Sequence, residues 1–459
     1  MNQFNVAHQT GARGFSCAVL VLVILWVISV DGSDWPQFLG PQRNGQTDEV
    51  GLLPTWPDTG PPQRWQKSIG TGYSAPSIRG DRLVLHHREG AQEIVEALSA
   101  ESGESLWKHS YPSDYVDPFG YNNGPRCAPV LSENRCYTFG AEGKLCCLDL
   151  ANGDVIWQRD THKDWNVPSP YFGVGSTPVL DSGRLLVMVG GQPNSGMVAL
   201  EPETGRVLWE SVGQDNWQGV PITIWPGKRT LRWKGYEKSA SYATPVVATV
   251  HDRPALFCLM RQGLIGLDPK TGKTSGKFFF RSTNDYSVNA ACPVVVGNQV
   301  LISNAYYRTG SVLLSVAADG ELKPVWSTKK LEIHWATPIH HQGYLYAFSG
   351  RNEPDARFIC LEWSTGKVLW DRDERWEKGS GIPDVYGRGS LIKAEGRLIV
   401  LGESGLLGQF SLNPKKDEEL ARFQVPGLRY PCWAGPVLSN GNLYLRSENL
   451  LVCLNLKAE

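Results

Sequence analysis

A motif recurs eight times along the 459-residue chain and constrains its fold more than any other feature. Each copy opens with a small residue, followed by proline in all copies but one, and continues with short apolar segments separated by turn residues. The openings are Ala75-Pro76, Ala128-Pro129, Thr177-Pro178, Thr244-Pro245, Cys292-Pro293, Thr337-Pro338, Ser390-Leu391 and Gly435-Pro436. Repeats of roughly 40 to 50 residues, each with four short strands, are typical of β-propellers. The sequence therefore predicts an all-β fold, an eight-bladed β-propeller of four-stranded blades.

A glycine stands four residues before a tryptophan in four of the copies. The pairs are Gly103 with Trp107, Gly153 with Trp157, Gly205 with Trp209, and Gly366 with Trp370. The glycine permits a positive φ in the hairpin before the fourth strand, and the tryptophan offers a large flat surface that can dock on the neighbouring blade. We expect this docking role for Trp65, Trp107, Trp157, Trp209, Trp326 and Trp370.

The final copy contains only three strands, at residues 436–438, 443–446 and 451–456. A single strand that carries Trp65 stands before the first copy, at residues 62–68. Pairing this N-terminal strand with the strand near residues 451–456 completes the last blade and removes its exposed edge. We therefore expect the ring to close through its two terminal segments.

The N-terminal residues have the features of an export signal. Arg13 precedes an apolar run at 18–30, and Gly32 provides a small residue for cleavage. We expect a signal peptide at 1–32, a lead-in segment at 33–61 and the propeller at 62–459, in a periplasmic or extracellular protein. The alternative is that the run remains as an uncleaved anchor, the one case in which we expect membrane contact.

The charge balance excludes one class of partner. Lys and Arg total 45 against 46 for Asp and Glu, so the net charge gives no field to hold nucleic acid.

One hairpin contains two cysteines that could pair in an oxidising compartment. If the turn at 140–143 centres on Ala141 and Glu142, it places Cys136 directly across from Cys147. We predict a disulfide between them, with packed thiols as the alternative.

The segment from Cys147 through Asp149 and Gly153 to Trp157 resembles the repeat of PQQ-like propellers, of the quinoprotein alcohol dehydrogenase type. That repeat reads Ala-x-Asp-x-x-x-Gly-x-x-x-Trp, and the resemblance covers nearly all of residues 62–457. Residues 34–45 (DWPQFLGPQRNG) are also similar to the start of secreted bacterial members, with Leu39 where arginine is commoner. The resemblance implies the fold, but it is weak evidence for an activity because one fold hosts many functions.

The connections from each fourth strand to the next first strand should emerge on one face, and they are rich in aromatic residues, arginine and asparagine. Such residues on loops of a rigid scaffold are common in recognition sites. The predicted ligand-binding residues are Arg126, Tyr242, Asp285, Asn289, Trp335, Asp384, Arg388 and Trp433.

Other chemical signals are weak. Adjacent residues on a strand face opposite sides, so neither the Cys146-Cys147 pair nor His86-His87 can address one ion or cofactor. The same holds for His340-His341, and no nucleophile motif is present. We expect no catalytic residue and no metal site.

The leading hypothesis is a non-catalytic, monomeric, exported binding or scaffold protein of the BamB type, which needs no cofactor and binds protein or carbohydrate on its loop face. The resemblance also leaves open a dehydrogenase of alcohols or sugars that uses PQQ and calcium. A carbohydrate-binding propeller is the third reading.

Overall fold

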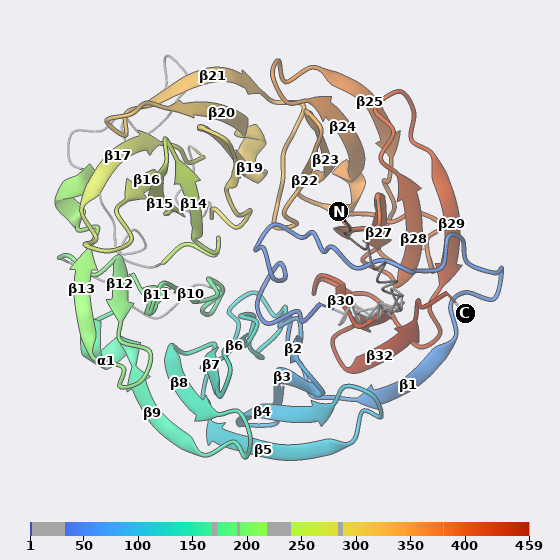
Figure 1. Cartoon of the computed structure of the whole chain (residues 1–459), viewed down its shortest axis with the longest axis horizontal. Helices are drawn as coiled ribbons and strands as arrows, with labels where there is room; N and C mark the ends of the chain where they lie inside the picture. The colour runs from blue at the N-terminus through green and yellow to red at the C-terminus, as the bar shows by residue number, and fades with distance from the viewer. Residues whose placement is uncertain are drawn as a thin grey trace. The chain divides into compact units, whose positions relative to one another are not determined.

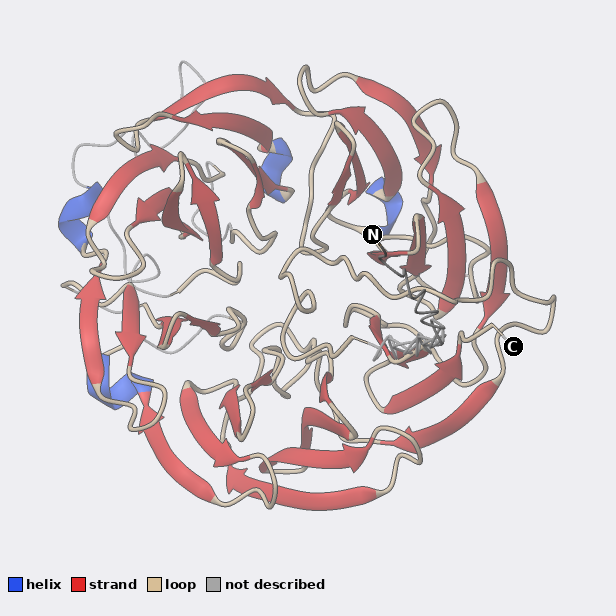
Figure 2. Cartoon of the chain, viewed as in Figure 1, coloured by secondary structure: helices blue, strands red, loops and turns tan. Residues whose placement is uncertain are grey.

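Eight four-stranded antiparallel sheets surround a common axis in the computed structural model (Figure 1), and almost all regular structure is β (Figure 2). The structure describes residue 1 and residues 33–167, 172–190, 193–217, 240–282, 288–379 and 381–458. The predicted fold class is confirmed, with eight blades of four strands each.

The first four blades follow one another in chain order. Blade 1 is β2 (Ser77–Arg79), β3 (Arg82–Glu89), β4 (Gln92–Ser99) and β5 (Ser105–Pro112); blade 2 is β6 (Val130–Leu131), β7 (Arg135–Phe139), β8 (Lys144–Asp149) and β9 (Val155–Asp160). Blade 3 is β10 (Val179–Asp181), β11 (Arg184–Met188), β12 (Met197–Leu200) and β13 (Val207–Ser211); blade 4 is β14 (Val246–Val250), β15 (Arg253–Leu259), β16 (Gly263–Leu267) and β17 (Thr274–Phe279).

The last four blades repeat this plan, and the terminal strands share blade 8. Blade 5 is β18 (Val294–Val296), β19 (Gln299–Asn304), β20 (Gly310–Val316) and β21 (Leu322–Thr328); blade 6 is β22 (Ile339–His341), β23 (Tyr344–Ser349), β24 (Arg357–Glu362) and β25 (Val368–Asp373). Blade 7 is β26 (Ser390–Ala394), β27 (Arg397–Leu401), β28 (Leu406–Ser411) and β29 (Glu419–Gln424); blade 8 is β30 (Val437–Ser439), β31 (Asn442–Arg446), β32 (Leu450–Asn455) and β1 (Gln63–Ser68).

The predicted closure of the ring is confirmed. β1 pairs antiparallel with β32, and Trp65 stands opposite Cys453. Arg446, on the neighbouring strand β31, is fully buried and donates to the carbonyl oxygens of Ser74 (2.7 Å) and Gly70 (3.3 Å). The C-terminal strands are therefore joined to the N-terminal part of the propeller in two ways. The β1–β32 pairing links them within blade 8, and the buried Arg446 side chain links them to the segment that precedes blade 1.

Helical structure is confined to short segments in the described residues. They are α1 (Thr161–Trp165) and the 3-10 turns η1 (Gln214–Trp217), η3 (Tyr306–Arg308) and η4 (Glu353–Asp355). Over the same ranges, no helix combines the length and the apolar character needed to cross a bilayer.

Tryptophans on the fourth strands link six of the eight blades to the next. The Nε1–H of Trp107 donates to the carbonyl oxygen of Leu150 in blade 2 (3.0 Å), and its ring lies against Gly153. The same indole-to-carbonyl bond joins Trp65 to Ala100, Trp157 to Pro202, Trp209 to Pro269, Trp326 to Trp363 and Trp370 to Asn413. Each contact spans adjacent blades, so the same indole-to-carbonyl hydrogen bond recurs at six junctions of the ring.

Two junctions replace the tryptophan by other means. At the junction of blades 4 and 5, Gly276 stands at the tryptophan position and a Cβ there would lie 2.0 Å from the carbonyl oxygen of Gly320, so the backbones themselves make the contact. At the junction of blades 7 and 8, the ring of Phe423 packs on Gly60. Glycine is required at these junctions because the neighbouring blade occupies the space of a side chain.

The lead-in segment crosses the face formed by the turns between first and second strands, which we call the turn face. Trp35 exchanges backbone hydrogen bonds with Ile78 on β2, and Arg43 forms an ion pair with Asp181 at the end of β10 (3.2 Å). Glu49 accepts from the backbone N–H groups of Asn440 and Gly441, both at 2.7 Å. Figure 1 shows this segment as the blue trace that runs from the middle of the ring to its rim.

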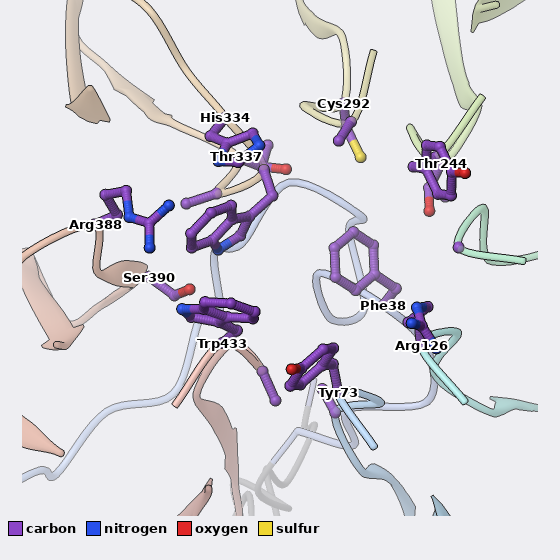
Figure 3. A pocket seen from close by; sticks show the side chains of 18 of the residues that line it. Phe38, Tyr73, Arg126, Thr244, Cys292, His334, Thr337, Arg388, Ser390 and Trp433 are labelled. Carbon is purple, nitrogen blue, oxygen red and sulfur yellow. The ribbon is translucent and has the colours of Figure 1, made fainter. Parts of the chain in front are cut away.

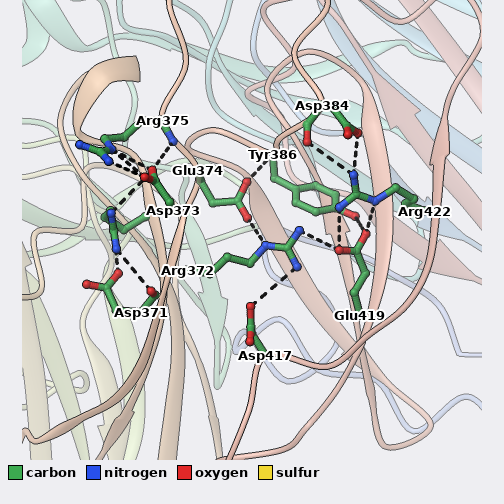
Figure 4. A network of polar contacts seen from close by, with 11 residues as sticks. Asp371, Arg372, Asp373, Glu374, Arg375, Asp384, Tyr386, Asp417, Glu419 and Arg422 are labelled. Carbon is green, nitrogen blue, oxygen red and sulfur yellow. Dashed lines mark hydrogen bonds and ion pairs between the residues drawn. The ribbon is translucent and has the colours of Figure 1, made fainter.

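A charged network joins the outer strands of blades 6 and 7 (Figure 4). Arg372 contacts Glu374 at 2.8 Å and Glu419 at 2.7 Å, and Glu374 accepts the backbone N–H of Tyr386 at 2.6 Å. Burial raises the pKa of Glu374 to about 7, even though the hydrogen bond from Tyr386 and the Arg372 guanidinium favour the carboxylate.

The docking contact predicts a specific pattern of non-additive stability. Gly153→Ala should destabilise strongly, because the φ of +79° disfavours alanine and the new Cβ would lie 2.5 Å from the Trp107 ring. Gly183→Ala is the matched control, since Gly183 has a φ of +71° and no atom within 4 Å of an added Cβ. The control should cost only about 1–2 kcal/mol of backbone strain.

Trp107→Ala should itself cost about 3–5 kcal/mol in urea unfolding. Combined with Trp107→Ala, Gly153→Ala should cost no more than Gly183→Ala, because the clash has been removed. Equal costs of Gly153→Ala in the presence and absence of Trp107 would contradict the docking contact.

The raised pKa of Glu374 predicts a pH effect on stability. Between the ordinary pKa of 4.5 and about 7, the folded chain holds a proton that the unfolded chain releases. This contribution to the free energy of unfolding is therefore complete below pH 4.5 and is lost as pH rises through about 7. Glu374→Gln should remove the loss, so the variant gains on the wild type between pH 5 and pH 8 in urea unfolding.

Asp417→Asn, which changes an exposed carboxylate of the same network, is the control. A difference between Glu374→Gln and wild type that stays constant with pH would show that Glu374 does not carry the proton.

Candidate functional site

A cavity of about 400 Å³ lies on the axis of the propeller. At one end the lead-in segment closes it with Trp35, Phe38 and Leu39, and Figure 3 shows Phe38 pointing into the middle. The opposite end is lined by the connections between fourth and first strands, which form what we call the loop face. The cavity is therefore blind at the turn face, and its size is in the usual range of ligand pockets.

The strand openings that define the sequence repeat line this cavity. Thr177, Thr244, Cys292, Thr337 and Ser390 come from five successive blades. The hydroxyl of Thr244 accepts the backbone N–H of Thr177 at 3.1 Å, and that of Thr177 accepts the N–H of Ala128 at 3.3 Å. The opening residues are small because eight strands converge here, and this recurrence is the sequence signal for the cavity.

Aromatic side chains from the loop face form its walls. Trp433 is central, with its ring centroid 5.0 Å from Tyr73, 5.2 Å from Trp335 and 6.0 Å from Tyr121. A second group places Phe172 at 5.0 Å from Phe119 and 5.8 Å from Tyr242. Tilted and edge-on rings at these separations attract one another, so the walls are held in place without a ligand.

Arg388 is bound by two carboxylates. Its Nη2 lies 2.7 Å from Glu353 and 2.9 Å from Glu403, and its guanidinium stacks 4.6 Å from the Trp335 ring. Although burial opposes ionisation, the charge of Arg388 contributes to lowering the pKa of Glu353. The Arg388 cation is thus already neutralised within the protein.

Glu403 organises this wall, and sequence reasoning missed it. It is fully buried and accepts the Nε1–H groups of Trp376 and Trp433, both at 3.1 Å, as well as the backbone N–H of Arg388 at 3.0 Å. It lies in the turn between β27 and β28. No local pattern marks a single glutamate in such a turn as the acceptor for three donors from two other connections.

Arg126 is held in the same way on the opposite side. Its Nη2 donates to Asp117 at 2.8 Å and to the carbonyl oxygen of Asn122 at 2.7 Å, so its charge is also matched.

A second arginine, which the sequence did not reveal, positions this connection. Arg88 on β3 donates to the carbonyl oxygens of Ser113 (2.8 Å), Tyr115 (2.7 Å) and Asn123 (3.0 Å). The loop at 113–126 is therefore fixed by a buried cation instead of by regular structure.

Five of the eight predicted ligand-binding residues line the cavity, namely Arg126, Tyr242, Trp335, Arg388 and Trp433. Asp285 lies outside the described residues.

The structure does not bring Asn289 or Asp384 to the cavity. Asn289 is buried, donates to the carbonyl oxygens of Met260 (2.7 Å) and Phe280 (3.1 Å), and accepts from Asn304 (2.6 Å). Asp384 points outwards and pairs with Arg422 at 2.6 Å in the network of Figure 4. Asn289 links blades 4 and 5, whereas Asp384 belongs to an exposed ion pair.

The predicted opposition of Cys136 and Cys147 is wrong. Phe139 pairs with Leu145, so the hairpin loop spans residues 140–144, and Cys136 stands opposite Leu148 while Cys147 stands opposite Tyr137. This one-residue shift puts the two sulfurs on opposite faces of the blade, in different core clusters. Burial raises the pKa of the Cys147 thiol to about 12, as expected for a packed, unreactive thiol.

The buried histidines also have structural partners. The Nε2 of His86 lies 3.2 Å from Glu93, and that of His87 lies 3.1 Å from Glu96. Across the ranges that the structure describes, no three His, Cys, Asp or Glu side chains are grouped so that they could hold a metal ion.

Comparisons with known sequences give one family and two relatives. The model of the family described as "Outer membrane protein assembly factor BamB" matches residues 57–164 and 91–372. The outer membrane protein assembly factor BamB of Yersinia pestis is 22% identical over 156 residues, which cover 32% of this chain and 35% of that protein. An uncharacterised protein of Rickettsia conorii is 24% identical over 144 residues, covering 30% of this chain and 32% of that protein. This chain thus matches about a third of each relative's length.

Solved structures of two kinds share the fold. BamB from Moraxella catarrhalis superposes with a TM-score of 0.57 at 13% identity, covering 86% of this chain and 98% of that chain. Quinohemoprotein alcohol dehydrogenase from Comamonas testosteroni gives 0.61 at 12% identity, covering 93% and 81%. At these identities the likeness shows the fold alone. The family ranges together run from residue 57 to residue 372, more than half of the chain, and the chain therefore belongs to the PQQ-repeat propeller family described as outer membrane protein assembly factor BamB.

Proposed function

We propose that this chain is an exported, monomeric, non-catalytic binding protein that holds a protein partner on its loop face. The observation that carries the proposal is the state of the cavity: its walls are aromatic, and Arg126 and Arg388 are already paired with Asp117, Glu353 and Glu403. The family description, which names an assembly factor, agrees with a binding role. Export rests on Arg13 and the apolar run at 18–30.

A quinone-dependent dehydrogenase is a poorer fit to the described residues. A tricarboxylated quinone needs several free cations, and a calcium ion needs grouped oxygen ligands beside a general base. Arg126 and Arg388 are engaged by carboxylates, while Asn289 and Asp384 lie elsewhere. The described residues among those predicted for the site are therefore a poor fit to PQQ and calcium.

A carbohydrate-binding role has one observation in its favour, the aromatic walls, on which a sugar ring could stack. Its hydroxyl groups would also need hydrogen-bond partners, since burying them without partners is costly. Some lining groups are committed, since the Tyr242 hydroxyl accepts the backbone N–H of Phe172 at 2.8 Å. Among the described residues, the Nε1–H of Trp335 has no hydrogen-bond partner and could serve one sugar hydroxyl. A protein ligand with apolar side chains makes no such demand.

Titration of the purified protein with PQQ and calcium tests the non-catalytic assignment. We expect no saturable quinone absorbance change and no reduction of an artificial dye with alcohols or aldoses, because Arg126 and Arg388 are already paired with carboxylates. A quinohemoprotein alcohol dehydrogenase assayed in parallel shows that the reagents are active. Stoichiometric quinone binding, or dye reduction that depends on quinone and calcium, would contradict the proposal.

A further inference from the structure

The rim of the cavity exposes apolar side chains on the loop at 113–126. Val116 is 69% exposed, Phe119 49% and Tyr121 56%. Phe119 and Tyr121 also belong to the cavity lining, so the exposed apolar surface continues into the pocket. Exposed aromatic residues beside a pocket are typical of an interaction surface, because aromatic residues are enriched at the centres of protein interfaces.

The interior favours an uncharged group. Arg126 faces Asp117, and Arg388 faces both Glu353 and Glu403, so each of these two cations already has a carboxylate partner within the protein. A third cation, Arg351, stacks on the Tyr306 ring with its guanidinium 4.4 Å from the ring centroid. A charged group entering the cavity would lose its hydration and would find Arg126 and Arg388 already paired, whereas an apolar side chain would gain contact with the rings.

The closed end limits how a polypeptide can enter. Trp35, Phe38 and Leu39 of the lead-in segment line the cavity at the turn face, so a polypeptide that enters from the loop face meets this segment. Arg88 fixes the loop that carries the rim residues, so the mouth is formed before a partner arrives. A preformed blind pocket accepts side chains that project from a segment lying across its mouth.

We propose that the axial cavity is the anchor site for one or two aliphatic or aromatic side chains, presented by an extended segment of a protein partner. The rim residues Val116, Phe119 and Tyr121 then contact the flanking part of that segment. This inference rests on the proposed function, since it specifies the chemistry of the partner that the loop face holds.

Isothermal titration with five capped peptides, Gly-Ser-X-Ser-Gly, tests the preference directly, where X is Trp, Leu, Ser, Asp or Lys. The Trp and Leu peptides should bind the full chain at least about tenfold more tightly than the other three. The Asp peptide also probes whether Arg351 draws an anion into the pocket.

Gly435→Phe provides an occlusion variant with little risk to the fold. Gly435 lines the cavity, its φ is not in the left-handed region, and an added Cβ meets no atom within 4 Å. The substitution should weaken binding of the Trp and Leu peptides at least about tenfold. Leu208→Phe, which adds a ring on the exposed outer strand β13, is the matched control and should bind like wild type.

A paired Phe119→Ala and Tyr121→Ala variant serves if Gly435→Phe does not fold, since both rings are about half exposed. It should also weaken the Trp peptide. Three results would overturn the inference: no saturable binding of the Trp and Leu peptides, equal or tighter binding of charged peptides or of methyl glucoside, or peptide binding that Gly435→Phe leaves unchanged. The quinone titration judges the non-catalytic proposal separately, so either proposal can fail without the other.

Discussion

The stacking of a fourth-strand tryptophan on the turn glycine of the next blade is the contact on which the rest of this structure depends. A blade is a small twisted sheet with little core of its own, and it becomes stable only when its faces are covered by neighbours. The indole buries a large apolar area, and its N–H finds a carbonyl in the neighbouring turn, as Trp107 does with Leu150. Because the contact has a fixed geometry, it also sets the spacing between blades, and the spacing of eight blades sets the width of the axial cavity.

Closure then determines where a ligand can reach the protein. β1 completes blade 8, so every blade has four strands, and the lead-in segment lies across the axis at the turn face. At the loop face, the aromatic side chains and the buried carboxylate of Glu403 form the wall of the cavity around its mouth. A symmetric scaffold thus acquires a single mouth, because one irregular segment covers only one of its two faces.

The repeated features of this structure could be predicted from the sequence, but most of the features that occur once could not. The Gly and Trp spacing, the small residue at each strand opening and the orphan Trp65 strand sufficed to predict the blades and their closure, because these features repeat and their physical reasons are local. Loop aromatics such as Trp335 and Trp433 could be placed near the axis once the fold was assumed. Glu403 and Arg88 could not be identified, because their partners are distant in sequence and each occurs once. The register of the Cys136 hairpin failed for a different reason: a turn one residue longer than assumed exchanges the faces of the strand.

The far end of the chain lies on the side of the ring away from the cavity mouth. The backbone N–H of Ala458 donates to the carbonyl oxygen of Gly51 in the lead-in segment, which itself lies across the turn face. An affinity handle joined directly after Ala458 therefore starts behind the cavity. Molecules captured on a sensor chip or bead through such a handle would have their turn faces towards the surface and their loop faces towards the solution. This orientation leaves the cavity mouth accessible in a surface-based binding measurement.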